Sequence, residues 1–184
     1  MGMEEQILAD GCRRGEDVAR RELYDRYAGR LLTICLRYAG DRATAEDLLH
    51  DAFLKIFGAF GRFSYRGPGS LRAWIERVTV NVALEWLRQT KRLDTVALDE
   101  GRSLSDAAEP DGEAVAAIPR DVLMSFVAEL PDGYRTIFNL YCIEEYSHRD
   151  IAQMLGINEK SSSSQLFRAR ALLSRRIRAY LEKN

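Results

Sequence analysis

The stretch from residue 62 to residue 70, RFSYRGPGS, combines arginines, aromatic rings, glycines and a proline. Aromatic and guanidinium groups offer flat faces on which an unpaired base can stack, and the cations can follow a phosphate backbone. This segment therefore has the chemistry needed to hold single-stranded nucleic acid. The alternative is a plain turn between two helices, with Phe63 packed in the core.

A helix is predicted to follow this loop, from Leu71 to Lys91. Its apolar positions, which we expect to face inward, are Leu71, Trp74, Ile75, Val78, Val82 and Trp86. A second side repeats at spacings of four, three and four residues and is then extended by two cations; it consists of Arg77, Asn81, Leu84, Arg88, Lys91 and Arg92. Loop and helix together predict a cationic surface beside aromatic rings, which is typical of nucleic-acid-binding proteins.

A second pattern with the chemistry of DNA recognition lies between residues 145 and 173. Ser147 and Asp150 match a capping box, the side-chain arrangement that starts a helix. Gly156 can end this short helix in the left-handed conformation, and Asn158 can cap a second helix. Such a corner is a helix-turn-helix, which places its second helix in a DNA major groove. The alternative is a structural or protein-binding helical hairpin.

A third surface is predicted on the helix that follows a first long helix over residues 18–38. Thr44 and Asp47 match another capping box, and the helix they would open has an apolar face broad enough for a core position. Its outer side would carry Asp47, His50, Asp51 and Lys55. A set of charges of this kind is most often a solvated helix face, so the residues alone leave both interpretations open.

Composition limits the class of protein to which these surfaces belong. The chain has 184 residues, of which 46% are hydrophobic, enough for one medium domain or two small packed ones. Its three cysteines stand apart from one another and from both histidines, which predicts neither a disulfide framework nor a zinc site and favours a reducing cytoplasm. No stretch has the length of an apolar membrane span, and the N-terminus lacks the apolar core of a signal peptide.

The formal net charge of −1 is unusual for a DNA-binding protein, because phosphate contacts need local positive charge. Charge is, however, segregated along the chain: seven acidic residues accompany a single arginine between Asp94 and Ile118. This stretch has no sustained apolar period, which predicts an acidic linker over residues 94–119. We therefore expect an all-α fold of two small helical domains, residues 4–93 and 120–184.

Four segments in this order resemble a bacterial extracytoplasmic-function sigma factor, the group 4 class of the sigma-70 family. They are the helix AEDLLHDAFLKIF, the loop and helix RFSYRGPGSLRAWIERVTVNVALEWLRQTKR, the acidic linker, and LPDGYRTIFNLYCIEEYSHRDIAQMLGINEKSSSSQLFRARALL. The resemblance implies a sigma-two and a sigma-four domain in a factor that binds core RNA polymerase, directs it to specific promoters and assists promoter melting. It also implies promoter DNA and an anti-sigma factor as partners, and no cofactor.

The resemblance assigns roles by position in the first domain. Core polymerase, through its beta-prime clamp and beta subunits, would be bound by Asp47, His50, Asp51 and Lys55. The loop from Phe63 to Leu71 would surround a flipped base of the minus-ten element, and the polar side of the next helix would follow the adjacent DNA. The residues assigned to that element are Arg62, Phe63, Tyr65, Arg66, Arg77, Asn81, Arg88, Lys91 and Arg92. The acidic linker would run through the polymerase toward the RNA path.

In the second domain, the second helix of the corner would recognise the minus-thirty-five element, supported by a helix over residues 131–142. The residues assigned to this element are Asn158, Glu159, Lys160, Ser161, Ser163, Ser164, Arg168 and Arg170, with Arg175 and Arg176 as further candidates for phosphate contact. The family often starts this helix with a Gly-Thr-Val-Lys-like sequence, whereas this chain has a serine run, in which we expect Ser162 to pack against the first helix of the corner. Gln165 stands where a basic residue is common. Short hydroxyl side chains discriminate bases less strongly than bidentate Arg or Asn, so the promoter sequence is not predicted.

Two other functions stay open on the residues alone. A repressor or activator would bind duplex DNA through the helix-turn-helix without polymerase, and a protein-interaction adaptor would use the corner only as a structural element. No catalytic residue is expected, because there is no nucleophile motif or phosphate-binding glycine loop and the two histidines are far apart in sequence. In a sigma factor, the polymerase supplies the chemistry.

Overall fold

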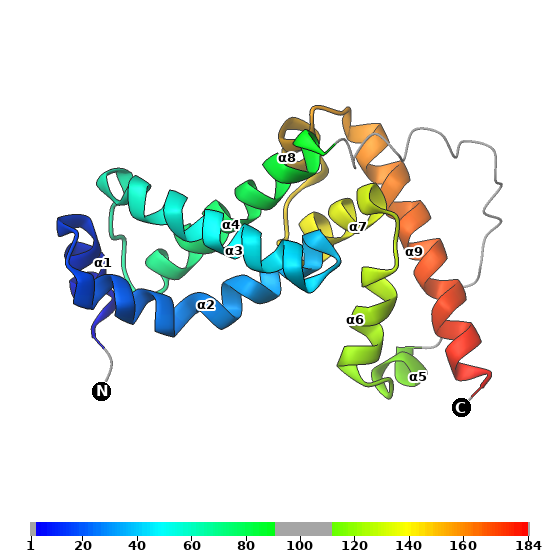
Figure 1. Cartoon of the computed structure of the whole chain (residues 1–184). Helices are drawn as coiled ribbons and strands as arrows, with labels where there is room; N and C mark the ends of the chain where they lie inside the picture. The colour runs from blue at the N-terminus through cyan, green and yellow to red at the C-terminus, as the bar shows by residue number, and fades with distance from the viewer. Residues whose placement is uncertain (1–2, 91–111, 184) are drawn as a thin grey trace. The chain divides into compact units, whose positions relative to one another are not determined.

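The computed structural model describes residues 3–90 and 112–183, and every regular element in these two ranges is a helix (Figure 1). The predicted all-α fold is confirmed. The chain separates into two compact units, Met1–Trp86 and Leu87–Asn184. Most of the predicted linker, residues 94–111, lies outside the described residues. Within the described ranges, no helix combines the length and the apolar character needed to cross a bilayer.

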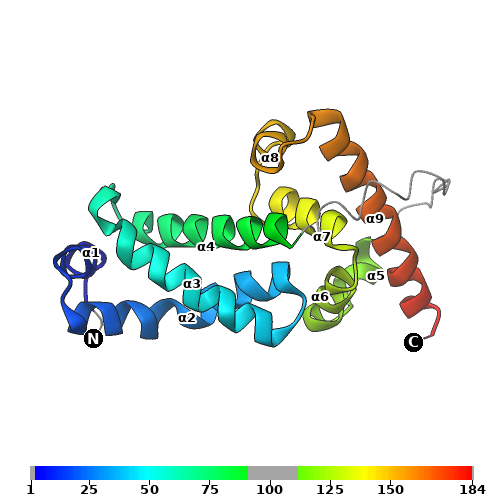
Figure 2. The same ribbon diagram turned by 45° about the horizontal axis from the view of Figure 1, so that its top comes forward.

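The described part of the first unit is a group of helices with one long loop. The helices are α1 (Glu5–Arg14), α2 (Asp17–Ala39), α3 (Arg42–Ala59), which a 3₁₀ turn over Phe60–Arg62 extends, and α4 (Ser70–Gln89). α2 and α3 lie side by side because only two residues join them (Figure 2). α4 packs against both, since Arg30 of α2 pairs with Glu76 and Lys55 of α3 pairs with Glu85.

The core of this unit is formed by aliphatic side chains from all of these helices. Side chains with no exposed surface include Leu8, Leu23, Leu31, Ile56, Leu71 and Ile75. Burying one such side chain contributes roughly 1.5–3 kcal/mol. The amphipathic faces of the helices, more than their helix propensity, therefore fix them in place.

α3 begins three residues before the predicted capping box. Asp41 is its N-cap: one carboxylate oxygen accepts a hydrogen bond from the Thr44 backbone N–H at 2.9 Å, and the other accepts one from the Thr44 hydroxyl at 2.8 Å. The prediction that Thr44 and Asp47 cap this helix is wrong, because the Asp41 carboxylate accepts two bonds beside the positive end of the helix dipole. Asp47 is left on the outer face of the helix.

The described part of the second unit is built around its long C-terminal helix. The helices are α5 (Gly112–Ala116), α6 (Arg120–Ala128), α7 (Asp132–Phe138), α8 (His148–Leu155) and α9 (Glu159–Leu181). α5 falls within the stretch predicted as linker. α9 packs against α6, α7 and α8, and the core between them contains Val127, Leu130, Tyr134, Ala169 and Leu173.

A buried arginine joins α6 to α7, which continues into a π-helical turn over Asn139–Ile143. The Arg135 side chain donates hydrogen bonds to the carbonyls of Ala128 at 3.1 Å and Leu130 at 3.0 Å, and it pairs with Asp132. Carbonyls at the end of a helix have no partner within the helix, so Arg135 satisfies groups that would otherwise be buried without one. These bonds fix the angle between α6 and α7, which both pack against α9.

Candidate nucleic-acid and protein-binding surfaces

The outer side of α3 carries an exposed row of polar side chains. Asp47, His50 and Asp51 are exposed and lie within one turn of one another on the same side of the helix. Lys55 is exposed as well, but its ion pair with Glu85 of α4 already balances its charge within the unit. The row is therefore acidic, as the sequence predicts.

Beside this row lie two exposed apolar side chains that the sequence analysis did not identify. Leu54 is 59% exposed on the same side of α3, and Tyr24 of α2 is 47% exposed with its ring 4.7 Å from that of Phe53. A groove between α2 and α3 is lined by Tyr24, Ala28, Gly29, Leu32, Arg42, Glu46, Leu49, His50 and Phe53. The surface around the acidic row therefore includes exposed apolar area and a groove as well as charges.

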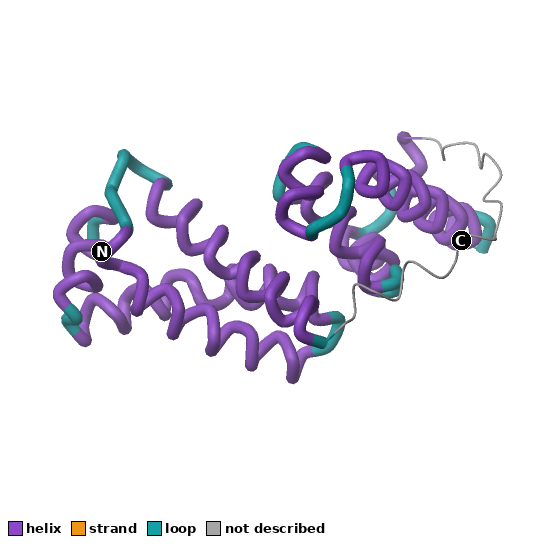
Figure 3. The backbone as a smooth tube through the Cα atoms, turned by 90° about the horizontal axis from the view of Figure 1, so that it is seen from above, coloured by secondary structure: helices purple, strands orange, loops and turns teal. Residues whose placement is uncertain are grey.

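Figure 3 draws the loop between α3 and α4 in teal, near the N-terminus. The first residue of this loop, Phe63, is buried. Phe63 is only 5% exposed, and its ring lies 4.9 Å from that of Trp74 and 6.3 Å from that of Phe60. Its predicted contact with DNA does not fit this position, because a large apolar ring gains more among aromatic neighbours than at a loop surface. The alternative, a core phenylalanine, is what the structure contains.

The rest of the loop keeps its accessible chemistry. Arg62 and Arg66 are exposed, and Tyr65 is half-buried. Gly67 has φ +118°, a left-handed conformation that other residues rarely adopt, and its carbonyl accepts a hydrogen bond from the Ser70 hydroxyl at 2.7 Å. In sequence, Tyr65 thus stands between two exposed arginines, and these are the residue types that the sequence predicts for binding an unpaired base.

Two residues that hold the loop were missed in the sequence. Glu5 of α1 accepts hydrogen bonds from backbone N–H groups where the loop ends, and Arg13 of α1 donates to backbone carbonyls where it begins. No local pattern could have identified them, because charged residues on a short amphipathic helix ordinarily face solvent and their partners lie about 50 residues or more away in sequence.

On α4, the predicted polar side is largely observed. Arg77, Asn81 and Arg88 are exposed, but Leu84 is fully buried and does not belong to this surface. Helical spacing gives only the direction in which a side chain points around the helix axis. Whether a leucine at that position is buried depends on the neighbouring elements that cover it. Trp74 and Trp86, predicted as core, are half-buried. Lys91 and Arg92 lie outside the described residues.

The predicted helix-turn-helix is present in α8 and α9 (Figures 1 and 2). The Asp150 N–H donates to the Ser147 hydroxyl at 3.1 Å, and the Ser147 N–H donates to the Asp150 carboxylate at 3.3 Å, which confirms the capping box. Gly156 ends α8 with φ +69°. Asn158 caps α9 by accepting from the Ser161 N–H at 2.7 Å. Local backbone geometry thus fixes the start of α8, its end and the start of α9.

The first turns of α9 present the predicted polar front. Its exposed members are Glu159, Lys160, Ser163 and Ser164, and Ser161 is partly exposed. Ser162 is fully buried, and its hydroxyl lies 2.9 Å from Nδ1 of His148, whose ring stacks on Tyr141. Ser162 therefore packs against the first helix of the corner, as we expected.

The arginines farther along α9 differ in what they contact. Arg170 is exposed beside the Tyr141 ring, Arg175 is exposed, and Arg168 is partly exposed. Arg176 instead donates to the carbonyls of Phe126 at 2.8 Å and Glu129 at 3.1 Å. Its predicted contact with phosphate does not fit these bonds, because the carbonyls at the end of α6 already occupy the guanidinium.

Two family models match successive parts of the chain. The model of sigma-70 region 2 matches residues 23–93, and the model of sigma-70 region 4 matches residues 120–173. The first match contains α3, the loop and α4, and the second contains the helix-turn-helix. Both matches fall in the order that the sequence resemblance predicts.

Relatives align over nearly their whole length. The chain is 27% identical to the ECF RNA polymerase sigma factor SigM of Bacillus subtilis, across 83% of this chain and 91% of that protein. It is 25% identical to the ECF RNA polymerase sigma-E factor of Haemophilus influenzae, across 95% of this chain and 96% of that protein. Its fold is similar to that of the sigma factor RpoE of Bartonella quintana, solved with the anti-sigma factor NepR, with a TM-score of 0.50, 20% identity, and coverage of 83% and 92%. The chain therefore belongs to the sigma-70 family, as an extracytoplasmic-function sigma factor.

Proposed function

We propose that this sigma factor directs core RNA polymerase to promoters through three surfaces, one for the polymerase and two for DNA. The observation that carries the proposal is the separation of charge. Exposed carboxylates form a row on α3, whereas exposed arginines lie on the loop, on α4 and on α9. A chain with a net charge of −1 can thus bind a protein through one surface and DNA through two others.

The α3 row, together with Leu54 and the α2–α3 groove, is the surface proposed for the polymerase. Asp47 and Asp51 would attract a basic partner, and the exposed apolar side chains would supply the contact area on which a stable interface depends. The beta-prime clamp is the partner that family membership implies. Because the polymerase itself holds DNA, each DNA surface of the chain needs only modest affinity of its own.

The loop and α4 are the surface proposed for the minus-ten element. Tyr65 would stack on an unpaired base while Arg62 and Arg66 contact the backbone on either side. Arg77 and Asn81 would follow the adjacent DNA. Extruding a base from a duplex costs about a few kcal/mol, which stacking and hydrogen bonds in the loop must offset. This surface would therefore assist melting as well as recognition.

The front of α9 is the surface proposed for the minus-thirty-five element. Lys160, Ser163 and Ser164 would face the major groove, and Arg168 and Arg170 would contact phosphates at its edge. Hydroxyl groups accept and donate hydrogen bonds, so they can contact either phosphates or bases. The phosphate contacts would supply most of the affinity of this surface and make it dependent on salt.

We further propose that the chain contributes placement and strand opening but no catalytic group, so that phosphodiester formation belongs to the core enzyme. It would then act in the cytoplasm, together with RNA polymerase. An anti-sigma factor is the regulator that family membership implies. A partner that covered the α3 row and its groove would block the proposed polymerase contact.

The test is transcription by core RNA polymerase and the purified chain on fragmented genomic DNA, followed by sequencing of the transcripts. We expect the 5′ ends to lie downstream of one shared pair of sequence elements and to disappear when the chain is omitted. No association with the core enzyme and no promoter-selective initiation would overturn the proposal. A conventional duplex-binding regulator would instead bind specific fragments tightly without polymerase.

A further inference from the structure

α1 lies before the matched part of region 2, which starts at residue 23, yet it binds the end of the minus-ten loop. One carboxylate oxygen of Glu5 accepts from the Gly69 N–H at 2.6 Å, and the other accepts from the N–H groups of Leu71 at 2.6 Å and Arg72 at 3.3 Å. The first N–H groups of a helix have no partner within the helix. Glu5 therefore acts as the cap of α4, supplied from another helix.

A second side chain of α1 binds the start of the loop. Nη2 of Arg13 donates to the carbonyl of Phe63 at 2.7 Å, and its Nε donates to that of Phe60 at 3.4 Å. Nη1 of the same guanidinium lies 2.7 Å from the Asp10 carboxylate, which orients it. Both ends of the loop are thus bonded through the backbone, and the side chains of Tyr65 and Arg66 make none of these bonds.

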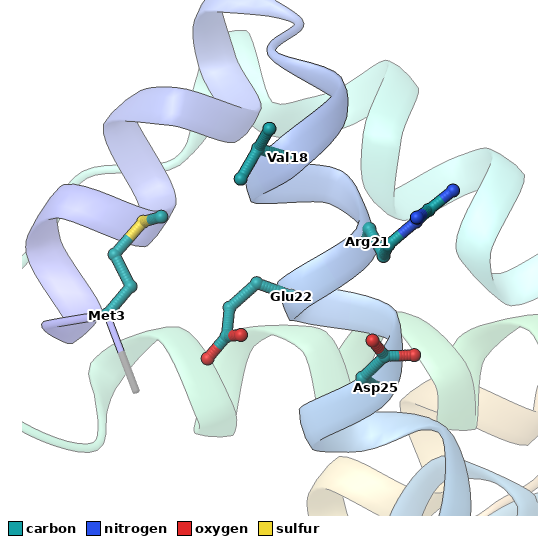
Figure 4. A pocket seen from close by; sticks show the side chains of 5 residues that line it. All are labelled: Met3, Val18, Arg21, Glu22 and Asp25. Carbon is teal, nitrogen blue, oxygen red and sulfur yellow. The ribbon is translucent and has the colours of Figure 1, made fainter. Parts of the chain in front are cut away.

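The separation of the two ends is set by a helix that is itself fixed in place. Glu5 and Arg13 are eight residues apart, which corresponds to about 12 Å along a helix at 1.5 Å per residue. A Cβ at Gly11 would lie 2.6 Å from the Cβ of Ala19, so α1 touches α2 directly. At the start of α1, Arg26 of α2 donates to the carbonyl of Met3 at 2.7 Å. Figure 4 shows Met3 beside α2, across a hollow from Val18 and Glu22.

We propose that α1 is a rigid support bonded to both ends of the minus-ten loop, and that Glu5 and Arg13 are positioning residues for base capture. This inference rests on the function proposed above for the loop. A flexible loop loses conformational entropy when it closes around a base. A loop already bonded at both ends has lost that entropy on folding, so more of its interaction energy is available to hold the extruded base.

The test uses the full chain in complex with core polymerase, on a promoter taken from the transcript mapping described above. The variants are Glu5→Ala and Arg13→Ala. The matched control is Glu4→Ala, which removes a neighbouring carboxylate that makes no cap bond. Each minus-ten base is replaced in turn, and open-complex formation is followed by 2-aminopurine fluorescence. The measured quantity is base preference, the ratio of rates with the original and the replaced base at the most sensitive position.

We expect base preference to fall about tenfold in Glu5→Ala and Arg13→Ala, since each change removes two or more hydrogen bonds that hold the loop backbone. Affinity for core polymerase and for a duplex minus-thirty-five fragment should stay within about twofold, because both of those surfaces lie on other elements. Glu5→Gln and Arg13→Lys each retain one hydrogen-bonding group at the site and should recover part of the preference. Glu4→Ala should behave as the unaltered chain.

Full base preference in both alanine variants would overturn this inference. It would also be overturned if affinity for core polymerase fell as much as base preference, because the substitution would then have disrupted the whole first unit. If an alanine variant does not fold, the conservative pair decides, and intact preference in both Glu5→Gln and Arg13→Lys overturns the inference. An unaltered chain without any base preference would overturn the function proposed for the loop as well. The two failures are therefore distinguishable.

Discussion

The two elements proposed to bind DNA are held by hydrogen bonds that span very different distances along the chain. In the helix-turn-helix, Ser147 pairs with Asp150 and Asn158 caps Ser161, each across three residues. In the minus-ten loop, Glu5 binds Leu71 across 66 residues and Arg13 binds Phe63 across 50. The helix caps of the corner are thus made by nearby residues, whereas both ends of the loop are bonded to a helix that is distant in sequence.

This difference suits the two kinds of DNA. A duplex offers a major groove of nearly constant width, into which a preformed corner of two helices fits with little adjustment. An unpaired base must first be extruded at a cost of about a few kcal/mol, so its binding site gains from being ordered in advance. Long-range bonds supply that order, and they make the loop sensitive to changes far from the DNA.

The largest effect is expected from Gly11→Ala, which should separate the behaviour of the two elements. The added methyl group would meet the Cβ of Ala19 at 2.6 Å, so α1 must shift, and we expect a loss of about 1–3 kcal/mol in unfolding free energy. Amide hydrogen exchange should rise across residues 63–71 and stay unchanged across 147–163. The control is Gly58→Ala, where nothing lies within 4 Å and stability should rise by up to about 1 kcal/mol. An equal rise in exchange in both elements would contradict the distinction.

A second variant, Asp51→Arg, should show that the polymerase surface is separate from both DNA elements. Reversing a charge in the exposed acidic row is expected to weaken association with core polymerase about tenfold, because the arginine would repel the basic partner that Asp51 is proposed to attract. Binding to a duplex minus-thirty-five fragment should not change. Titration of labelled core polymerase measures the effect, and a parallel loss of duplex binding would show that the surfaces are not independent.

Ser147→Ala should weaken the corner without touching the loop. Loss of an N-cap hydroxyl costs about 1 kcal/mol, so the equilibrium constant for local opening of the corner should rise several-fold. Amide hydrogen exchange across residues 147–163 should accelerate by the same factor. Base preference at the minus-ten element should be unaltered. A change in that preference would mean that the two elements are coupled.

Arg168→Ala and Arg176→Ala form a pair that sharpens the assignment of phosphate contacts on α9. Removal of Arg168 should lower affinity for the minus-thirty-five duplex a few-fold and reduce the slope of log K against log salt by about one. Arg176 binds the carbonyls of Phe126 and Glu129, so its loss should lower stability and leave the salt slope intact. The opposite pattern would exchange their roles.

The smallest perturbation uses the cysteines as reporters. Burial raises the pKa of the Cys12 thiol to about 11 and that of Cys35 to about 12, whereas Cys142 is exposed. At pH 8 the two buried thiols stay protonated and covered, so only Cys142 should react quickly with a thiol reagent, and all three should react after denaturation. Cys12 lies on α1, so Gly11→Ala should speed its labelling. Fast labelling of Cys12 in the unaltered chain would show that α1 opens readily from α2.

The features predictable from sequence are those whose causes are local. The capping box at Ser147, the left-handed Gly156 and the cap at Asn158 depend on backbone geometry within a few residues. The acidic row on α3 follows from helical spacing alone. The order of the two regions follows from several such local patterns taken together.

The features that escaped prediction depend on neighbours that are distant in sequence. Helical spacing placed Leu84 on a polar side, yet the folded chain covers it completely. Arg176 has the same charge as Arg175, but only Arg176 lies beside the final carbonyls of α6. In the sequence, nothing distinguishes Glu5 from the other charged residues. In the folded chain, α1 packs beside the first turn of α4, and Glu5 binds its N–H groups. Charge and spacing describe a side chain, whereas its role here depends on which backbone groups come within hydrogen-bond reach.

The central claim is that the loop binds unpaired DNA while α9 binds duplex DNA. The most direct test uses a forked promoter, which is double-stranded at the minus-thirty-five element and single-stranded at the minus-ten element. The measurement is the affinity of the chain in complex with core polymerase for forks that carry or lack the captured base. We expect removal of that base to lower affinity about tenfold, as loss of one stacked base implies, and to leave binding of the upstream duplex alone unchanged. Equal affinity for the two forks would contradict this division of labour.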